Sequence, residues 1–309
     1  MRLTFGILIS LMVGAAHANT DLTAAIENVR TTCGNISAEL SDMKKMAGIT
    51  TAVTGGGTVA GGIALGTGLA KANVDKEIEE LEAQIARLKA ERGDVPVEHL
   101  QIEDEALFEH QVAEFIESYQ TKAQELSAAE KKSKQLGNVR TGTMAAATAT
   151  NIAGAVMSGT NRVKGDLKQQ IDECLTSVKT LSNVRMQARI DGSANDTDLA
   201  RVENIIRACD AWSTVDITPI NNRSKGATVS SGIGAGLGLA GTITSASANS
   251  DGVRNGDDKQ KEQNLNTAAN VLAGGTTAAS LSATIFNATQ ISAIKRAATV
   301  ADECEGALK

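Results

Sequence analysis

The sequence predicts an all-α protein made of two duplicated helical-hairpin units, with uncharged transmembrane helices and a coiled-coil arm in the first unit. Three observations lead to this prediction. The chain has long uncharged segments rich in Gly, Ala and Thr, cysteines at similar distances outside them, and a charged heptad pattern between the first two. Only 2% of residues are aromatic. Because aromatic side chains supply much of the buried area of most cores, this composition favours helices packed through small residues.

Small residues recur at every fourth position in the uncharged segments. These segments cover 46–70, 141–161, 226–250 and 263–294. On a helix such a spacing would form a continuous stripe, and small residues in a stripe allow close helix approach. We predict that the following glycines line these helix contacts: Gly62, Gly66, Gly154, Gly232, Gly236 and Gly275. Strands are the less favoured alternative, because apolar and polar residues do not alternate.

The uncharged segments raise the question of what surrounds them. Each glycine costs a helix in water about 1 kcal/mol relative to alanine, so packing or a bilayer must compensate. We expect the segments to contact membrane lipid. The alternative is a soluble all-helical coiled-coil scaffold or adaptor. It is supported by the weak hydrophobicity of the segments and by Asn151, Asn270 and Asn287, whose amides are unfavourable in lipid.

The four cysteines bracket these segments with matching spacings. Cys33 and Cys209 precede the first and third segments, and Cys174 and Cys304 follow the second and fourth. The local sequences Asp-Glu-Cys at 172–174 and 302–304 also agree, which indicates a diverged internal duplication. The spacing favours the disulfides Cys33–Cys174 and Cys209–Cys304. Two other connectivities, and free buried cysteines, are the alternatives.

The first residues have the layout of a secretory signal peptide. Arg2 precedes a short apolar run, and Ala16-His17-Ala18 supplies a small-residue cleavage site. We therefore expect an exported protein divided into a signal peptide (1–18), a first unit (19–190) and a second, shorter unit (198–309). The expected location is a membrane of the cell envelope, with the periplasm or the extracellular space as alternatives. An uncleaved anchor is the less favoured interpretation of the first segment.

The connector of the first unit predicts a coiled-coil arm over 74–136. Apolar residues at alternating spacings of four and three form a heptad seam: Val74, Ile78, Leu81, Ile85 and Leu88. Gly93-Asp94-Val95-Pro96 should end this helix, and a second helix should return antiparallel to it. Such an arm can bind a second copy or an envelope partner, or act only as a spacer.

The sequence offers little support for catalysis or for a cofactor. Gly236–Gly241 matches G-x-G-x-x-G, but no strand is expected before it. His99 with Glu103, and His110 with Glu114, have helical spacing for a metal, yet such residues more often line a solvated acidic face. The acidic net charge of −6 gives no electrostatic reason to bind nucleic acid.

These observations predict an exported structural or assembly protein rather than an enzyme. We expect no cofactor and no resident metal. The expected role is assembly in the cell envelope through small-residue helix packing, with an oligomeric pore component as one form of it. The soluble secreted or periplasmic scaffold remains the alternative.

Overall fold

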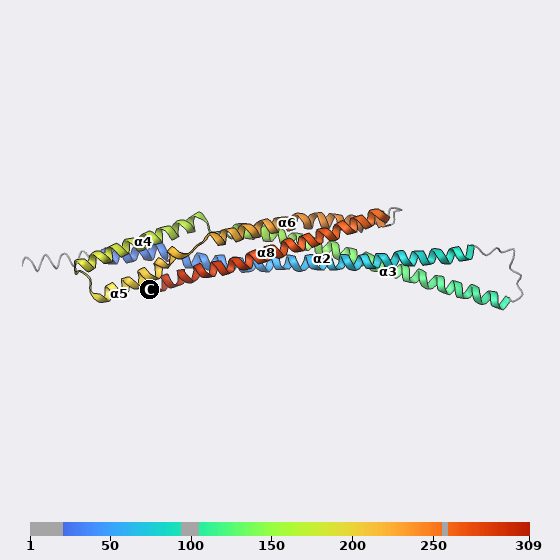
Figure 1. Ribbon diagram of the computed structural model, residues 1–309, viewed down its shortest axis with the longest axis horizontal. Helices are drawn as coiled ribbons and strands as arrows, with labels where there is room; N and C mark the ends of the chain where they lie inside the picture. Colours follow the sequence, from blue (N-terminus) through green and yellow to red (C-terminus); the bar gives the residue numbers. More distant parts are fainter. Residues whose placement is uncertain (1–20, 94–104, 255–258) are drawn as a thin grey trace, which may run out of the picture. The chain divides into compact units, whose positions relative to one another are not determined.

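The computed structural model describes residues 21–93, 105–254 and 259–309 (Figure 1). Within these ranges the regular elements are all helices, which confirms the all-α prediction. The predicted signal peptide at 1–18 lies outside the described residues. After a helix over 21–33, the elements are α2 (Ile36–Gly93), α3 (Glu105–Thr160), α4 (Gly165–Ile190), α5 (Asp196–Asp210), η2 (Ala211–Thr214), α6 (Thr218–Ala248), α7 (Asp251–Arg254) and α8 (Lys259–Leu308).

The gap between the two predicted units, 191–197, contains the turn that separates α4 from α5. Gly192 adopts a positive φ of 62°, which a residue with a side chain rarely adopts. Asn195 then caps α5, because its side chain accepts a hydrogen bond from the Asp198 backbone N–H at 2.8 Å. Both features are local to the turn, and Ala194 beside them also packs against the core of unit 1.

The compact units of the fold do not coincide with the two sequence halves. Among the described residues, unit 1 contains 21–53, 153–230 and 282–309, and unit 2 contains those within 54–152 and 231–281. Each unit therefore combines segments from both halves of the chain. Within unit 2, parts of α2, α3, α6 and α8 lie side by side (Figure 1).

The buried positions of the long helices alternate between spacings of three and four residues. This is the heptad spacing of a coiled coil, and it extends far beyond the predicted arm. On α8 the buried residues are Asn266, Ala269, Ala273, Thr276, Ser280, Ala283, Asn287, Gln290, Ile294, Ala297, Ala301, Cys304 and Leu308. The same spacing holds on α6 from Ile220 to Ala248. We call these buried positions the seam.

The predicted period-four packing stripes therefore need a correction. Gly62, Gly66, Gly232 and Gly236 are exposed, and a methyl group added to each would meet no atom within 4 Å. The reason is geometric, because four residues advance an α-helix by more than one full turn and a period-four stripe drifts about 40° at each step. A heptad seam averages 3.5 residues and stays on one face.

Large apolar residues lie on the outside of the uncharged segments. In unit 2 the exposed residues of this kind include Val59, Ile63, Leu69, Ile152, Ile233, Leu239, Ile243, Val271 and Leu281. Among the residues described, no helix combines the length and apolarity needed to cross a membrane.

Candidate interaction site

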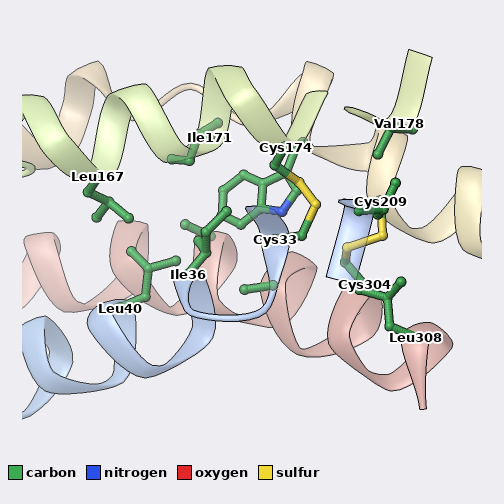
Figure 2. Packing of buried hydrophobic residues seen from close by; sticks show 14 of the residues in the cluster. Cys33, Ile36, Leu40, Leu167, Ile171, Cys174, Val178, Cys209, Cys304 and Leu308 are labelled. Atoms are coloured by element: carbon green, nitrogen blue, oxygen red, sulfur yellow. A yellow bond between two sulfur atoms is a disulfide. The ribbon is translucent and has the colours of Figure 1, made fainter. Parts of the chain in front are cut away.

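Unit 1 has an apolar core that contains both disulfides (Figure 2). The bonds join Cys33 to Cys174 and Cys209 to Cys304, as the cysteine spacing predicts. Ile36, Leu40, Leu167, Ile171 and Val178 surround them, and all five are at least 94% buried. The core thus joins the helix over 21–33, α4, α5 and α8 by covalent bonds as well as by apolar burial.

The cysteines are also the only potential metal-binding group found among the described residues. The sulfur atoms of Cys33, Cys209 and Cys304 lie within 4.8 Å of one another, but each belongs to a disulfide. A sulfur atom in a disulfide is no thiolate ligand. His99, Glu103 and the side chain of His110 lie outside the described residues.

Unit 2 has a polar seam in which Asn151 of α3 occupies a space left by two glycines. Its Nδ2 donates to Ser280 Oγ at 2.8 Å, and Ser280 Oγ donates to Asn151 Oδ1 at 3.0 Å. A Cβ on Gly57 or on Gly234 would come within 3.5 Å of the Asn151 side chain. Glycines of α2 and α6 therefore make room for one buried amide, which is hydrogen-bonded to α8.

The same arrangement recurs along the seam of unit 2. A Cβ on Gly238 would lie 2.5 Å from Thr148 Oγ1, and one on Gly61 would lie 3.3 Å from the Thr277 Cα. The seam glycines therefore do allow close helix approach, but they are not the ones that the period-four stripes indicate. Of the predicted set, Gly154 is buried, and a Cβ on Gly275 would lie 3.0 Å from Leu237 Cδ1.

Arg140 of α3 ends the uncharged section of unit 2 as a fully buried cation. Its guanidinium donates to Ser245 Oγ at 2.8 Å, to Asn266 Oδ1 at 2.7 Å and to Asn270 Oδ1 at 3.3 Å. Burial lowers the pKa of Arg140, while the charges of Asp75 and Glu262 oppose that shift. The side chain thus fastens α3 to α6 and α8 through three charge-assisted hydrogen bonds.

Lys71 of α2 forms the second part of this ionic network. Its Nζ lies 2.6 Å from Asp75 Oδ2 and 3.2 Å from Glu262 Oε1, and its side chain is fully buried. Asp75 also accepts a hydrogen bond from Ser133 Oγ at 2.6 Å. Two cations and two carboxylates therefore balance in charge where the uncharged section meets the arm.

A groove of about 750 Å³ lies beside this network on unit 2. Residues of α2, α3, α7 and α8 line it, including Ile78, Glu79, Glu82, Ser127 and Glu130. Gln263 donates to Glu79 at 2.5 Å, and Lys259 forms an ion pair with Glu82. The groove therefore lies at the N-terminal end of α8. Beyond this point α8 no longer covers α2 and α3.

The predicted coiled-coil arm consists of the ends of α2 and α3. Val74 and Leu81 pack with Ala129, and Ile78, Leu126 and Leu136 lie around them. Towards the far end of the arm, Ile85, Leu88 and Tyr119 are only half-buried. The seam thus continues along the arm, but two helices cover it less completely than four.

Sequence reasoning missed the polar seam and the ionic network. Alternating spacings of three and four do run through Gly, Ser, Thr and Asn as well as through Leu, but without large apolar residues this spacing does not indicate which face is buried. Gly236–Gly241 illustrates the same point, since this G-x-G-x-x-G match lies inside α6 and contributes Gly238 and Gly241 to the seam. A helix interior is not the strand-to-helix loop that a dinucleotide site requires.

Comparisons with known proteins place the chain in no family. No family model matches it, and the searches found no matching curated protein and no matching solved structure.

Proposed function

We propose that the protein is an exported structural or assembly protein of the cell envelope, and not an enzyme. One observation carries this proposal: the uncharged segments bury Asn, Ser and Thr and expose Val, Ile and Leu. Val59, Ile63 and Leu69 of α2 are 47–64% exposed, whereas Thr54 of the same helix is fully buried. Extended apolar surfaces of this kind mark contacts with a partner or with lipid.

We favour lipid as the environment of these exposed apolar faces. Exposed apolar residues occur on α2, α3, α6 and α8 alike, and a bilayer surrounds a bundle on every side whereas one protein partner covers one side. The shortest uncharged segment, 141–161, would span about 30 Å as a helix, which is the thickness of the hydrocarbon core. The helices of the bundle would enter the bilayer together, because their buried polar groups pair with one another between the helices.

The soluble scaffold is the second candidate, and a specific finding favours it. No described helix is apolar enough to cross a membrane by itself. In this form the outer faces would contact other protein chains instead of lipid, and the arm would be the extended binding element. The assembly role is common to both candidates.

An alkaline carbonate wash distinguishes lipid from protein as the covering of these faces. Full-length protein is expressed in a secreting host, and its membranes are washed and pelleted. Retention in the pellet supports lipid contact, and release as a soluble helical protein supports the scaffold.

Two triple variants make this test specific. Val59→Ser with Ile63→Ser and Leu69→Ser should release the protein from the pellet, because these outer side chains would no longer contact lipid. The matched control replaces Ala83, Ala86 and Ala90 of the exposed arm by serine and should leave retention unchanged. Equal release of both triple variants would contradict the lipid proposal.

A further inference from the structure

Exposed basic side chains gather where the uncharged segments end in unit 1. One comes from α2, one from the turn between α3 and α4, one from α6 and two from α8: Lys44, Lys164, Lys225, Lys295 and Arg296. All of them are exposed, and all belong to unit 1. We call these residues the basic belt.

Contacts between α2 and α8 place their belt residues at one level. Ser37 Oγ of α2 donates to Asp302 Oδ1 of α8 at 2.5 Å. The two helices run in opposite directions (Figure 1), so seven residues after Ser37 and seven before Asp302 lead to Lys44 and Lys295. These two lysines therefore lie at nearly the same height along the helices.

Contacts of α8 with α3 and α6 bring the other belt residues close. Gln290 Nε2 donates to the Asn161 carbonyl at 2.8 Å, and the Arg223 guanidinium of α6 donates to the Thr289 carbonyl at 2.6 Å. Each of these four residues lies at most six residues from a belt residue along the chain, which is about 9 Å along a helix. The belt is therefore shared by four segments of unit 1 and is not a patch on one helix.

The belt carries positive charge that ion pairs leave uncompensated. Among the described residues, no belt side chain forms an ion pair, whereas the neighbouring Lys45 pairs with Asp42 at 3.1 Å. Asp and Glu are absent from the stretches 43–74, 131–165, 217–250 and 263–301. The belt thus differs from the buried ionic network of unit 2, in which the charges balance.

Exposed apolar residues follow the belt on the same outer helix faces. Lys225 and Val229 are four residues apart, and Ile285 and Arg296 are eleven apart, so the members of each pair share a helix face. Val229 is 61% exposed and Ile285 is 54% exposed. A lysine or arginine in such a place can lay its aliphatic part on the apolar surface and keep its charge in water. This order of side chains fits the boundary between the hydrocarbon and headgroup layers of a bilayer.

We propose that the basic belt binds the phosphate groups of anionic phospholipids at the surface of a bilayer. The proposal rests on the lipid contact proposed above and adds the class of lipid and the residues that select it. Two observations support it: the unpaired cations on four segments of unit 1, and the apolar side chains that follow them on the same faces. A peptide or a nucleic acid would cover one side of the bundle, whereas headgroups surround it on every side.

Vesicle flotation tests the choice of lipid. The full chain is expressed in a secreting host, purified in a neutral detergent and diluted into vesicles of phosphatidylcholine, either alone or mixed with an equal amount of phosphatidylglycerol. We expect tighter binding to the mixed vesicles, seen as half-maximal binding at a lower lipid concentration. Added salt should reduce this difference, because it screens charges at the membrane surface.

A pair of double variants makes the test specific. Lys225→Gln with Arg296→Gln should weaken binding to the mixed vesicles about tenfold and leave binding to phosphatidylcholine unchanged. The matched control, Lys179→Gln with Arg201→Gln, removes the same charges from exposed positions of α4 and α5 and should change neither affinity. The swap Lys225→Arg with Arg296→Lys keeps the charges and should keep the preference. Circular dichroism should show equal helicity in all three variants.

The outcomes separate this proposal from the lipid contact on which it rests. Equal binding of the full chain to both kinds of vesicle, or equal weakening by the control variant, would overturn the role of the belt and leave lipid contact standing. Binding to neither kind of vesicle would overturn both proposals. Loss of the preference in inorganic phosphate, at an ionic strength matched with chloride, would assign the belt to a free anion and overturn its role in lipid binding.

Discussion

The two units of this protein use the same heptad seam but fill it with different chemistry. Unit 1 buries a continuous set of Leu, Ile and Val side chains around two disulfides. Unit 2 buries only small apolar clusters and relies on Asn151, Lys71 and Arg140 in hydrogen-bonded positions. Apolar burial is non-directional, whereas a buried amide or guanidinium is stable only with its partners in place. We therefore expect unit 1 to tolerate changes of shape and unit 2 to require specific partners.

The largest effect should follow from removing a disulfide of unit 1. The Cys33–Cys174 bond closes a loop with a sequence separation of 141. Replacing both cysteines by alanine should lower the free energy of unfolding by about 5 kcal/mol in the chain-entropy model. Urea unfolding of the whole chain measures this loss, because the closed loop also contains the parts of α2 and α3 that belong to unit 2. A loss well below about 2 kcal/mol would contradict the chain-entropy account.

The ionic network of unit 2 should be the next most sensitive feature. Arg140→Ala removes three hydrogen bonds and leaves Asp75 and Glu262 without one of their two cations. The expected loss is about 3–5 kcal/mol, measured by urea unfolding. The exposed Lys131→Ala is the matched control on the same helix and should change stability by less than about 0.5 kcal/mol. Similar losses for both variants would show that Arg140 acts only as a surface charge.

Asn151 and Ser280 provide a test of directional bonding in unit 2. Asn151→Leu alone should cost about 1–3 kcal/mol, because Ser280 Oγ would lose both hydrogen bonds to Asn151 in a buried position and keep the one to the Thr276 carbonyl. Combining it with Ser280→Ala should recover most of this loss, since both polar groups are then gone. A double-mutant cycle in urea measures the coupling. Simple additivity of the two changes would argue against the pair.

Two adjacent glycines give the smallest effect and the sharpest test of the seam. Gly61→Ala should destabilise unit 2 by about 1–3 kcal/mol, because its Cβ would press on the Thr277 backbone. Gly62→Ala should instead stabilise α2 by up to about 1 kcal/mol, because its Cβ meets open space and alanine is the better helix former. Thermal unfolding of both variants measures the difference. A loss of stability in Gly62→Ala together with a gain in Gly61→Ala would instead support the period-four stripe.

Much of the fold could be predicted from local sequence. The uncharged segments are helical, the arm follows its Leu and Ile heptads, and the disulfide pairing follows the cysteine spacing. The residues of the candidate site could be predicted less well from the sequence. Asn151 and Arg140 could not be assigned to the inside, because a polar residue in a weakly amphipathic helix carries no mark of the side it faces.

The sequence by itself thus determined the helices, the turn at Gly192 and the covalent links, because these depend on backbone preference and on spacing along the chain. The tertiary structure decided which glycines are buried, which polar groups pair and how segments of both halves combine into each unit. The physical reason is that Gly, Ala, Ser and Thr differ little in hydrophobicity. Which face is buried is then decided by partners on other helices, such as Ser280 for Asn151 and Asn266 for Arg140.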